Sequence, residues 1–171
     1  MSRDINRLKP DFRINVKKLY SICKKEGYIL IPFYTERDVY EQAKLYRQSR
    51  PWKEIKATIN YLKIEKAPFL AQVLEEVGPQ NGIWATNAPP GFSFHQWGEA
   101  VDSFLLIGGK AVWKEDHEGY WIYHREAIRL GLHSSYGYGD RVHIQRRSGK
   151  PTYFHSIRDI DRIMRKRYEK V

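Results

Sequence analysis

The sequence has 171 residues, five Trp, twelve Tyr and seven Phe, and an apolar share of 42%, which together favour one folded domain and exclude a disordered chain. No stretch approaches the roughly 18 to 20 apolar residues of a membrane-spanning helix, and the single cysteine, Cys23, excludes an internal disulfide and a cysteine-based zinc site. The formal net charge of +10 attracts polyanions such as nucleic acid, acidic glycopolymers or anionic lipid, and by itself does not choose among them.

Hydrophobic periodicity, and the Gly and Pro residues that interrupt it, predict helices and strands along the whole chain. In chain order, we expect a helix over 10–26, a strand over 28–33, a helix over 36–48, two helices within 50–77, a break at 78–91, a strand over 99–107, its hairpin partner at 110–113, a helix over 120–130, a strand over 141–145 and a basic helix over 156–169. Thr35 and Asp38 resemble a capping box, which would place Arg37 in the first turn of the second helix, where the helix dipole disfavours a cation. Because no repeat or linker separates these elements, the sequence predicts a single α+β domain over 1–171.

Asp102 is the most informative single residue, because it interrupts AVDSFLLI, a stretch otherwise suited to a buried strand. A buried carboxylate without a partner is very costly, so Asp102 needs a cation or strong hydrogen-bond donors. His95 precedes it by seven residues, and Gly98 lies between the two. A glycine there allows the chain to double back, so that both side chains can face one site.

A second histidine, His143, lies in RVHIQ, where Val142 and Ile144 alternate with polar residues. This alternation directs His143 to the strand face opposite the apolar pair. Two histidines and one carboxylate are a standard catalytic zinc set that leaves a position for water, and a further carboxylate such as Asp140 would serve as the general base. Taken one at a time, a histidine in such a position is more often an ordinary structural residue than a ligand. Spacing alone therefore does not decide whether these residues form a metal site.

Three blocks of the sequence resemble one family. TNAPPGFSFHQWGEAVD at 86–102 resembles the T-x-A-x-P-G-x-S-x-H-x-x-G-x-A-x-D signature of the zinc peptidases that include D-Ala-D-Ala carboxypeptidases and L-alanyl-D-glutamate endopeptidases. RDVYEQAKLY at 37–46 resembles the family's R-S-x-x-E-Q-x-x-L-Y helix, and GDRVHIQ at 139–145 resembles its D-x-x-H-F-Q block. The resemblance covers a core of about 28–145, within which a helical region at about 50–82 is longer than the family leads us to expect.

The resemblance implies a small antiparallel sheet with helices packed around it, of the hedgehog/DD-peptidase type, with zinc in an open cleft. It implies that His95, Asp102 and His143 hold the zinc ion. It also implies that Asp140 is the catalytic carboxylate and that Arg37 is the substrate-binding arginine, which would give a purpose to a cation in an unfavourable position.

The implied reaction is hydrolysis of a peptide bond next to a D-amino acid in peptidoglycan. An aspartate at position 140, rather than a glutamate, resembles the L-alanyl-D-glutamate endopeptidases found in phage endolysins, and a D-Ala-D-Ala carboxypeptidase is the alternative within the family. Ser93 and Gln145 are candidate substrate-binding or supporting groups. The chain departs from the family after Gly131-Leu132, where HSSYGYG replaces a W-G-G-x-W stretch. The resemblance therefore does not define which residues form the wall of the substrate cleft.

Two readings from other classes stay open. The basic helix over 156–169 and the net charge favour a nucleic-acid-binding module, although no signature of one is present, and adhesion to an acidic cell wall would use the same charge. A zinc-containing binding protein without catalysis is the other. Because the N-terminal stretch lacks the apolar segment of a signal peptide, we expect the protein to stay cytoplasmic before release and then to act on the cell wall. We also expect a monomer that does not insert into the membrane and binds no nucleic acid.

Overall fold

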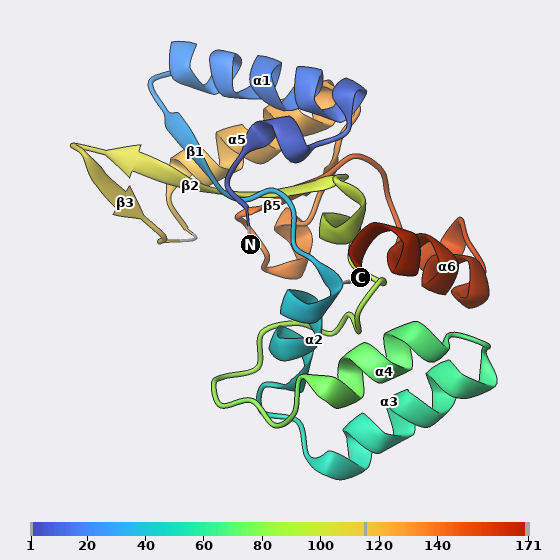
Figure 1. The fold of residues 1–171 in the computed structure, drawn as a ribbon. Coiled ribbons are helices and arrows are strands. Elements are labelled where there is room, and N and C mark those ends of the chain that lie inside the picture. The colour runs from blue at the N-terminus through green and yellow to red at the C-terminus, as the bar shows by residue number, and fades with distance from the viewer. Residues whose placement is uncertain (1, 115, 170–171) are drawn as a thin grey trace. The chain divides into compact units, whose positions relative to one another are not determined.

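The computed structural model describes residues 2–114 and 116–169 (Figure 1). Its α-helices are α1 (Pro10–Lys25), α2 (Val39–Arg47), α3 (Trp52–Ile64), α4 (Pro68–Glu76), α5 (Glu118–Arg129) and α6 (Ile157–Tyr168). Its strands are β1 (Ile29–Tyr34), β2 (Ala100–Ile107), β3 (Lys110–Val112), β4 (His133–Ser134) and β5 (His143–Gln145). The α+β class predicted from the sequence is confirmed.

The chain forms two compact units, each assembled from two separate stretches. The first unit combines the chain up to Glu36 with Trp97–Ser148, and the second combines Arg37–Gln96 with the chain after Ser148. Neither unit is continuous in sequence. No helix in the described ranges is long and apolar enough to cross a membrane.

The sheet lies in the first unit, and all of its pairings are antiparallel. Among the described residues its strand order is β1-β2-β5-β4, and β3 also pairs with β2. The hairpin from β2 into β3 turns at Gly108 and Gly109, both with positive φ, as the sequence predicts. β2 is therefore the central strand, because β1, β3 and β5 all bond to it.

Helices α1 and α5 pack against the same face of this sheet (Figure 1). Along β2, Val101, Ser103 and Leu105 are buried, whereas Asp102, Phe104 and Leu106 are only partly buried. We call the side of the sheet toward α1 and α5 the helix face and the opposite side, which carries Asp102 and Phe104, the site face. α1 contributes four buried side chains to the core on the helix face: Phe12, Val16, Leu19 and Cys23.

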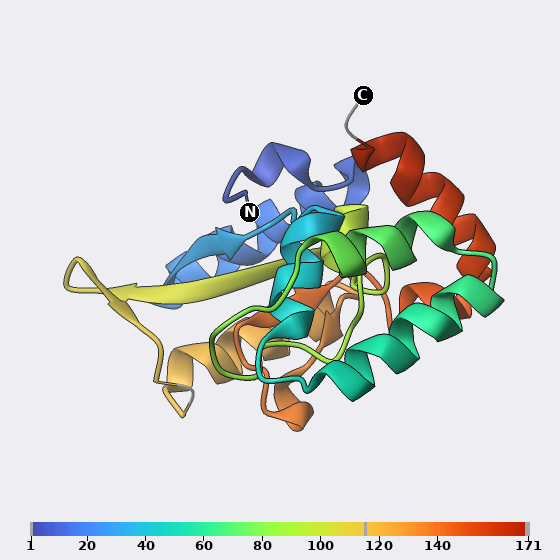
Figure 2. The same cartoon turned by 60° about the horizontal axis from the view of Figure 1, so that its bottom comes forward.

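The second unit is helical. α3 and α4 run side by side in both views (Figures 1 and 2), and α4 also packs against α2 and α6. The Asp161 side chain of α6 accepts a hydrogen bond from the Leu70 backbone N–H in the first turn of α4 at 2.8 Å. This contact satisfies one of the donors that every helix leaves unpaired at its N-terminus.

The start of α2 differs from the sequence prediction. The helix begins at Val39, because Asp38 is its N-cap and forms a capping box with Glu41, three residues later than predicted. The Thr35 hydroxyl instead donates to backbone oxygens near the N-terminus of the chain. Arg37 consequently precedes the helix, and the prediction that it lies in the first turn was wrong.

Candidate metal centre

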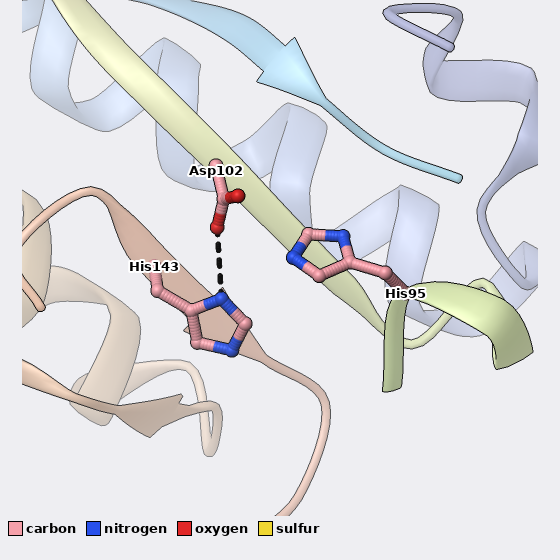
Figure 3. Close-up of side chains that lie close together, drawn as sticks. All are labelled: His95, Asp102 and His143. Atoms are coloured by element: carbon pink, nitrogen blue, oxygen red, sulfur yellow. Dashed lines mark hydrogen bonds and ion pairs between the residues drawn. The ribbon is translucent and has the colours of Figure 1, made fainter. Parts of the chain in front are cut away.

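Strand pairing places Asp102 and His143 on the same face of the sheet. The two residues are Cα partners in the antiparallel ladder between β2 and β5, and side chains of such partners point to the same side. Ile144, which follows His143 on β5, is fully buried on the helix face, so the two side chains point to opposite faces as predicted. The His143 Nδ1 atom lies 2.8 Å from the Asp102 Oδ1 atom, and each side chain is 13% exposed (Figure 3).

His95 lies in a short 3-10 helix over Phe94–Trp97, immediately before a sharp change of direction at Gly98. Gly98 has a φ of +65°, and a Cβ atom there would lie 2.8 Å from the Arg7 backbone oxygen. Any other residue would therefore strain the backbone and collide with it. The prediction that Gly98 allows the chain to double back is confirmed.

His95, Asp102 and His143 form one cluster (Figure 3). Each offers one ligand atom, and these three atoms lie within 4.8 Å of one another. Two imidazoles and a carboxylate are a donor set that zinc uses in catalytic sites, with one position left for water or substrate. The residues that spacing and resemblance single out can thus hold a metal ion.

Gln145 holds the His143 ring in position. The His143 Nε2 atom lies 3.0 Å from the Gln145 Oε1 atom, while the Gln145 amide nitrogen donates to the Arg147 backbone oxygen at 2.8 Å. The second bond holds the amide with its oxygen facing His143. Both ring nitrogens of His143 thus have a polar neighbour, and Nδ1 is the one turned toward Asp102. A hydrogen bond to one ring nitrogen commonly orients a histidine that binds a metal through the other.

The electrostatic surroundings of His143 favour a cation. Burial lowers the pKa of His143, but the hydrogen bond and the charge of Asp102, together with the charge of Asp140, raise this pKa to about 9. Two carboxylates that stabilise an imidazolium in this way also attract a divalent cation. Asp140 itself is exposed, in the loop before β5.

Arg37 lies beside His95 in the second unit. Its backbone N–H lies 3.5 Å from the His95 backbone oxygen, and its guanidinium donates to the Gln42 Oε1 atom at 2.9 Å. The Gln42 oxygen also accepts from Gln96 at 3.1 Å, and the Gln42 amide donates to the Ala88 backbone oxygen at 2.7 Å. Gln42, which the sequence analysis did not single out, therefore joins α2 to the segment that carries His95.

Ser93 organises the turn before His95. Its Oγ atom accepts from the His95 backbone N–H at 3.4 Å, and its own N–H donates to the Gln96 side chain at 3.2 Å. These contacts are those of a residue that begins a 3-10 turn. A role for Ser93 in binding substrate stays a prediction.

His124, to which the sequence analysis assigned no role, anchors the loop that carries Asp140. It is 2% exposed on α5, with Nδ1 2.7 Å from the Ser134 hydroxyl and Nε2 2.6 Å from the Arg141 backbone oxygen. Burial lowers the pKa of His124 to about 4. Its helical spacing with the buried Tyr120 is the signal that could have placed it inside.

Glu99 is a further residue near the site that no sequence pattern singles out. It is fully buried and forms ion pairs with Lys9 and Arg147, the latter at 2.9 Å. Its backbone oxygen accepts from the Arg146 N–H at 2.8 Å. These contacts fasten the N-terminal end of β2, three residues before Asp102, to the chain that leaves β5.

Comparison with protein families gives a match that covers most of the chain. A family model described as VanY, D-alanyl-D-alanine carboxypeptidase, matches residues 5–146. That range is most of the chain and includes the three clustered residues as well as Arg37 and Asp140. No curated protein gives a significant match.

Proposed function

Since this chain belongs to the VanY family of D-alanyl-D-alanine carboxypeptidases, we propose that it is a zinc peptidase that cleaves the stem peptides of peptidoglycan as an L-alanyl-D-glutamate endopeptidase of the endolysin type. Family membership supports the general part of this proposal, namely that the protein is a peptidase that acts on peptidoglycan. The observation that carries the metal dependence is the cluster of His95, Asp102 and His143, with three ligand atoms within 4.8 Å.

The three clustered side chains would hold the zinc ion, and Gln145 would keep His143 in its metal-binding orientation. When bound, zinc supplies a Lewis acid and lowers the pKa of a water molecule from ~15.7 toward ~7. The negative field of Asp102 and Asp140 at His143 supports binding of a divalent cation.

Asp140 would act as the general base and then as the general acid. It would take the proton of the attacking water and pass it to the leaving amine, so that the proton count balances over the reaction. Its exposure in the loop before β5 leaves it accessible to solvent and substrate, and its charge acts on the nearby His143.

Arg37 would bind a carboxylate of the substrate. A guanidinium offers several donors in a fixed plane that matches carboxylate geometry. Its hydrogen bond to Gln42 and its backbone contact with His95 support a fixed position for this charge within the second unit. A buried arginine held in this way would select peptides that carry an acidic group near the cleaved bond.

The choice of bond rests on Asp140. An aspartate at this position supports the endopeptidase, whereas the description of the matched family favours removal of the terminal D-alanine. We propose that the protein works as a monomer on the cell wall after release from the cytoplasm.

Mass spectrometry of purified peptidoglycan incubated with the protein, with and without a chelator, tests this proposal. An L-alanyl-D-glutamate endopeptidase releases peptides that begin with D-glutamate, and the chelator abolishes their release. Release of free D-alanine alone would support the carboxypeptidase instead. Digestion at full rate by the metal-free protein would overturn the zinc mechanism.

A further inference from the structure

The site face of the sheet carries a group of aromatic rings. Phe33, Phe104 and Trp113, here called the aromatic cluster, have ring centroids 6.3 Å apart for Phe33 and Phe104, 4.8 Å for Phe33 and Trp113, and 5.1 Å for Phe104 and Trp113. Trp113 is 45% exposed, and the other two rings are only partly buried. Grouped aromatic side chains that stay accessible to solvent are typical of binding surfaces.

Strand geometry places this cluster next to the metal ligands. Phe104 follows Asp102 by two residues on β2, so both point to the site face, about 7 Å apart along the strand. In the first unit, the aromatic cluster and the Asp102–His143 pair therefore lie on the same side of the sheet. A molecule bound at the metal would extend over these rings if it ran along β2.

A β-bulge brings Tyr34 to the same side of the sheet as Phe33. The register between β1 and β2 shifts between Pro32, paired with Ser103, and Tyr34, paired with Asp102, which leaves Phe33 as the extra residue. Phe33 and Tyr34, although consecutive, consequently have ring centroids only 4.0 Å apart instead of pointing to opposite faces. Bulges that re-aim a side chain in this way are common beside active sites.

Positive charge borders the cluster. The Arg3 guanidinium lies 5.0 Å from the centre of the Phe33 ring and is exposed. It adds a cation at the edge of an otherwise apolar surface, which suits a ligand that has an apolar ring face and nearby carboxyl groups.

We propose that the aromatic cluster binds the N-acetylmuramic acid ring that carries the stem peptide. This inference rests on the proposed function, because it takes peptidoglycan as the substrate. The C–H face of a sugar ring is apolar and flat enough to stack on aromatic rings. L-Alanine is the stem residue joined to this sugar, so cleavage between L-alanine and D-glutamate leaves the sugar one residue from the reacting bond.

The distances favour this occupant. One extended residue spans about 3.3 to 3.6 Å, which together with the link to the sugar is comparable to the roughly 7 Å between Asp102 and Phe104 along β2. In removal of the terminal D-alanine, the sugar would lie four residues instead of one from the reacting bond, which places it about 10 Å farther away. The position of the aromatic cluster therefore favours the endopeptidase, in which the sugar and the cleaved bond are bound close together.

The test compares two substrates with the same stem peptide, one attached to the N-acetylglucosamine–N-acetylmuramic acid disaccharide and one free. Trp113→Ala should lower kcat/KM for the sugar-bearing substrate about tenfold, as for an aromatic side chain central to recognition, and change it less than twofold for the free peptide. Phe104→Leu, which keeps an apolar side chain in the strand, should act in the same direction. Trp121→Ala is the matched control, because Trp121 is similarly exposed, at 48%, but lies on α5.

A second measurement does not depend on hydrolysis. Saturation-transfer NMR of the disaccharide without peptide should show contact with the wild-type protein and with Trp121→Ala, and weaker contact with Trp113→Ala. If the wild type cleaves neither substrate but binds the disaccharide through Trp113, the sugar site stands and the proposed function fails. An equal loss on both substrates, or unchanged kinetics and binding for Trp113→Ala, would overturn the inference.

Discussion

The two faces of β2 share one backbone but have different tasks. The helix face carries Val101 and Leu105, both fully buried against α1 and α5, whereas the site face carries Asp102 and Phe104, both partly accessible. Burial of apolar surface on the first face stabilises the fold, at about 25 cal/mol per Å². The second face carries polar and aromatic groups whose burial is incomplete. Substitutions on the two faces should therefore separate stability from activity, residue by residue along one strand.

Asp102→Asn is expected to have the largest effect on activity. It keeps the size of the side chain but removes the charge that would bind a cation and that pairs with His143 at 2.8 Å. We expect loss of stoichiometric zinc, measured by elemental analysis, and a fall in peptidoglycan hydrolysis of about three orders of magnitude or more. Retention of zinc and of wild-type activity would break the assignment of the site face.

Asp140→Ala separates catalysis from metal binding. Since Asp140 lies in an exposed loop and is not one of the clustered ligands, the variant should keep its zinc. Because Asp140 is the proposed general base, its loss should reduce kcat by about 10² to 10⁴, with KM little changed. Asp116→Ala, at an exposed residue near the N-terminus of α5, is the control and should leave both zinc content and kcat unchanged. A binding protein without catalysis would be indifferent to both substitutions.

Leu105→Ala tests the helix face. Leu105 is fully buried, so its truncation should reduce the free energy of unfolding by about 2 to 5 kcal/mol, as measured by denaturant titration. The folded fraction should keep its zinc and its kcat. Leu106→Ala, at the adjacent and less buried position, should cost clearly less. Equal costs at the two positions would contradict the division of β2 into two faces.

The buried His124 should make the free energy of unfolding depend on pH, which is a smaller effect than those above. Its pKa is about 4 in the folded protein, against an ordinary value of 6.5, so the unfolded chain binds more protons between these two values. The free energy of unfolding should therefore be undiminished above pH 6.5 and should fall by at most about 3 kcal/mol as the pH drops toward 4. His124→Gln, which keeps a hydrogen-bonding side chain but cannot ionise, should lack this part of the acid sensitivity. The difference between the two denaturant titrations across pH isolates the contribution of this residue.

Much of the local structure could be predicted from the sequence. The helix at Pro10–Lys25, the strand at Ile29–Tyr34 and the hairpin at Gly108-Gly109 all follow from periodicity and turn residues, which depend on near neighbours along the chain. The start of α2 could not be predicted from the sequence, because Thr35 with Asp38 and Asp38 with Glu41 are both plausible capping boxes. Hydrogen bonds from Thr35 to a distant part of the chain decide between them.

The sequence by itself determined the chemistry of the candidate site: two histidines, a carboxylate, and a glycine that lets the chain turn between His95 and Asp102. Only the tertiary structure decided that Asp102 and His143 are partners across β2 and β5, that Gln145 contacts the His143 ring, and that a bulge brings Tyr34 to the same face as Phe33 and Asp102. The physical reason is that side-chain direction in a sheet depends on register, and a shift of one residue exchanges the two faces. Register is set by pairing between strands that are far apart in the chain, so no local pattern encodes it.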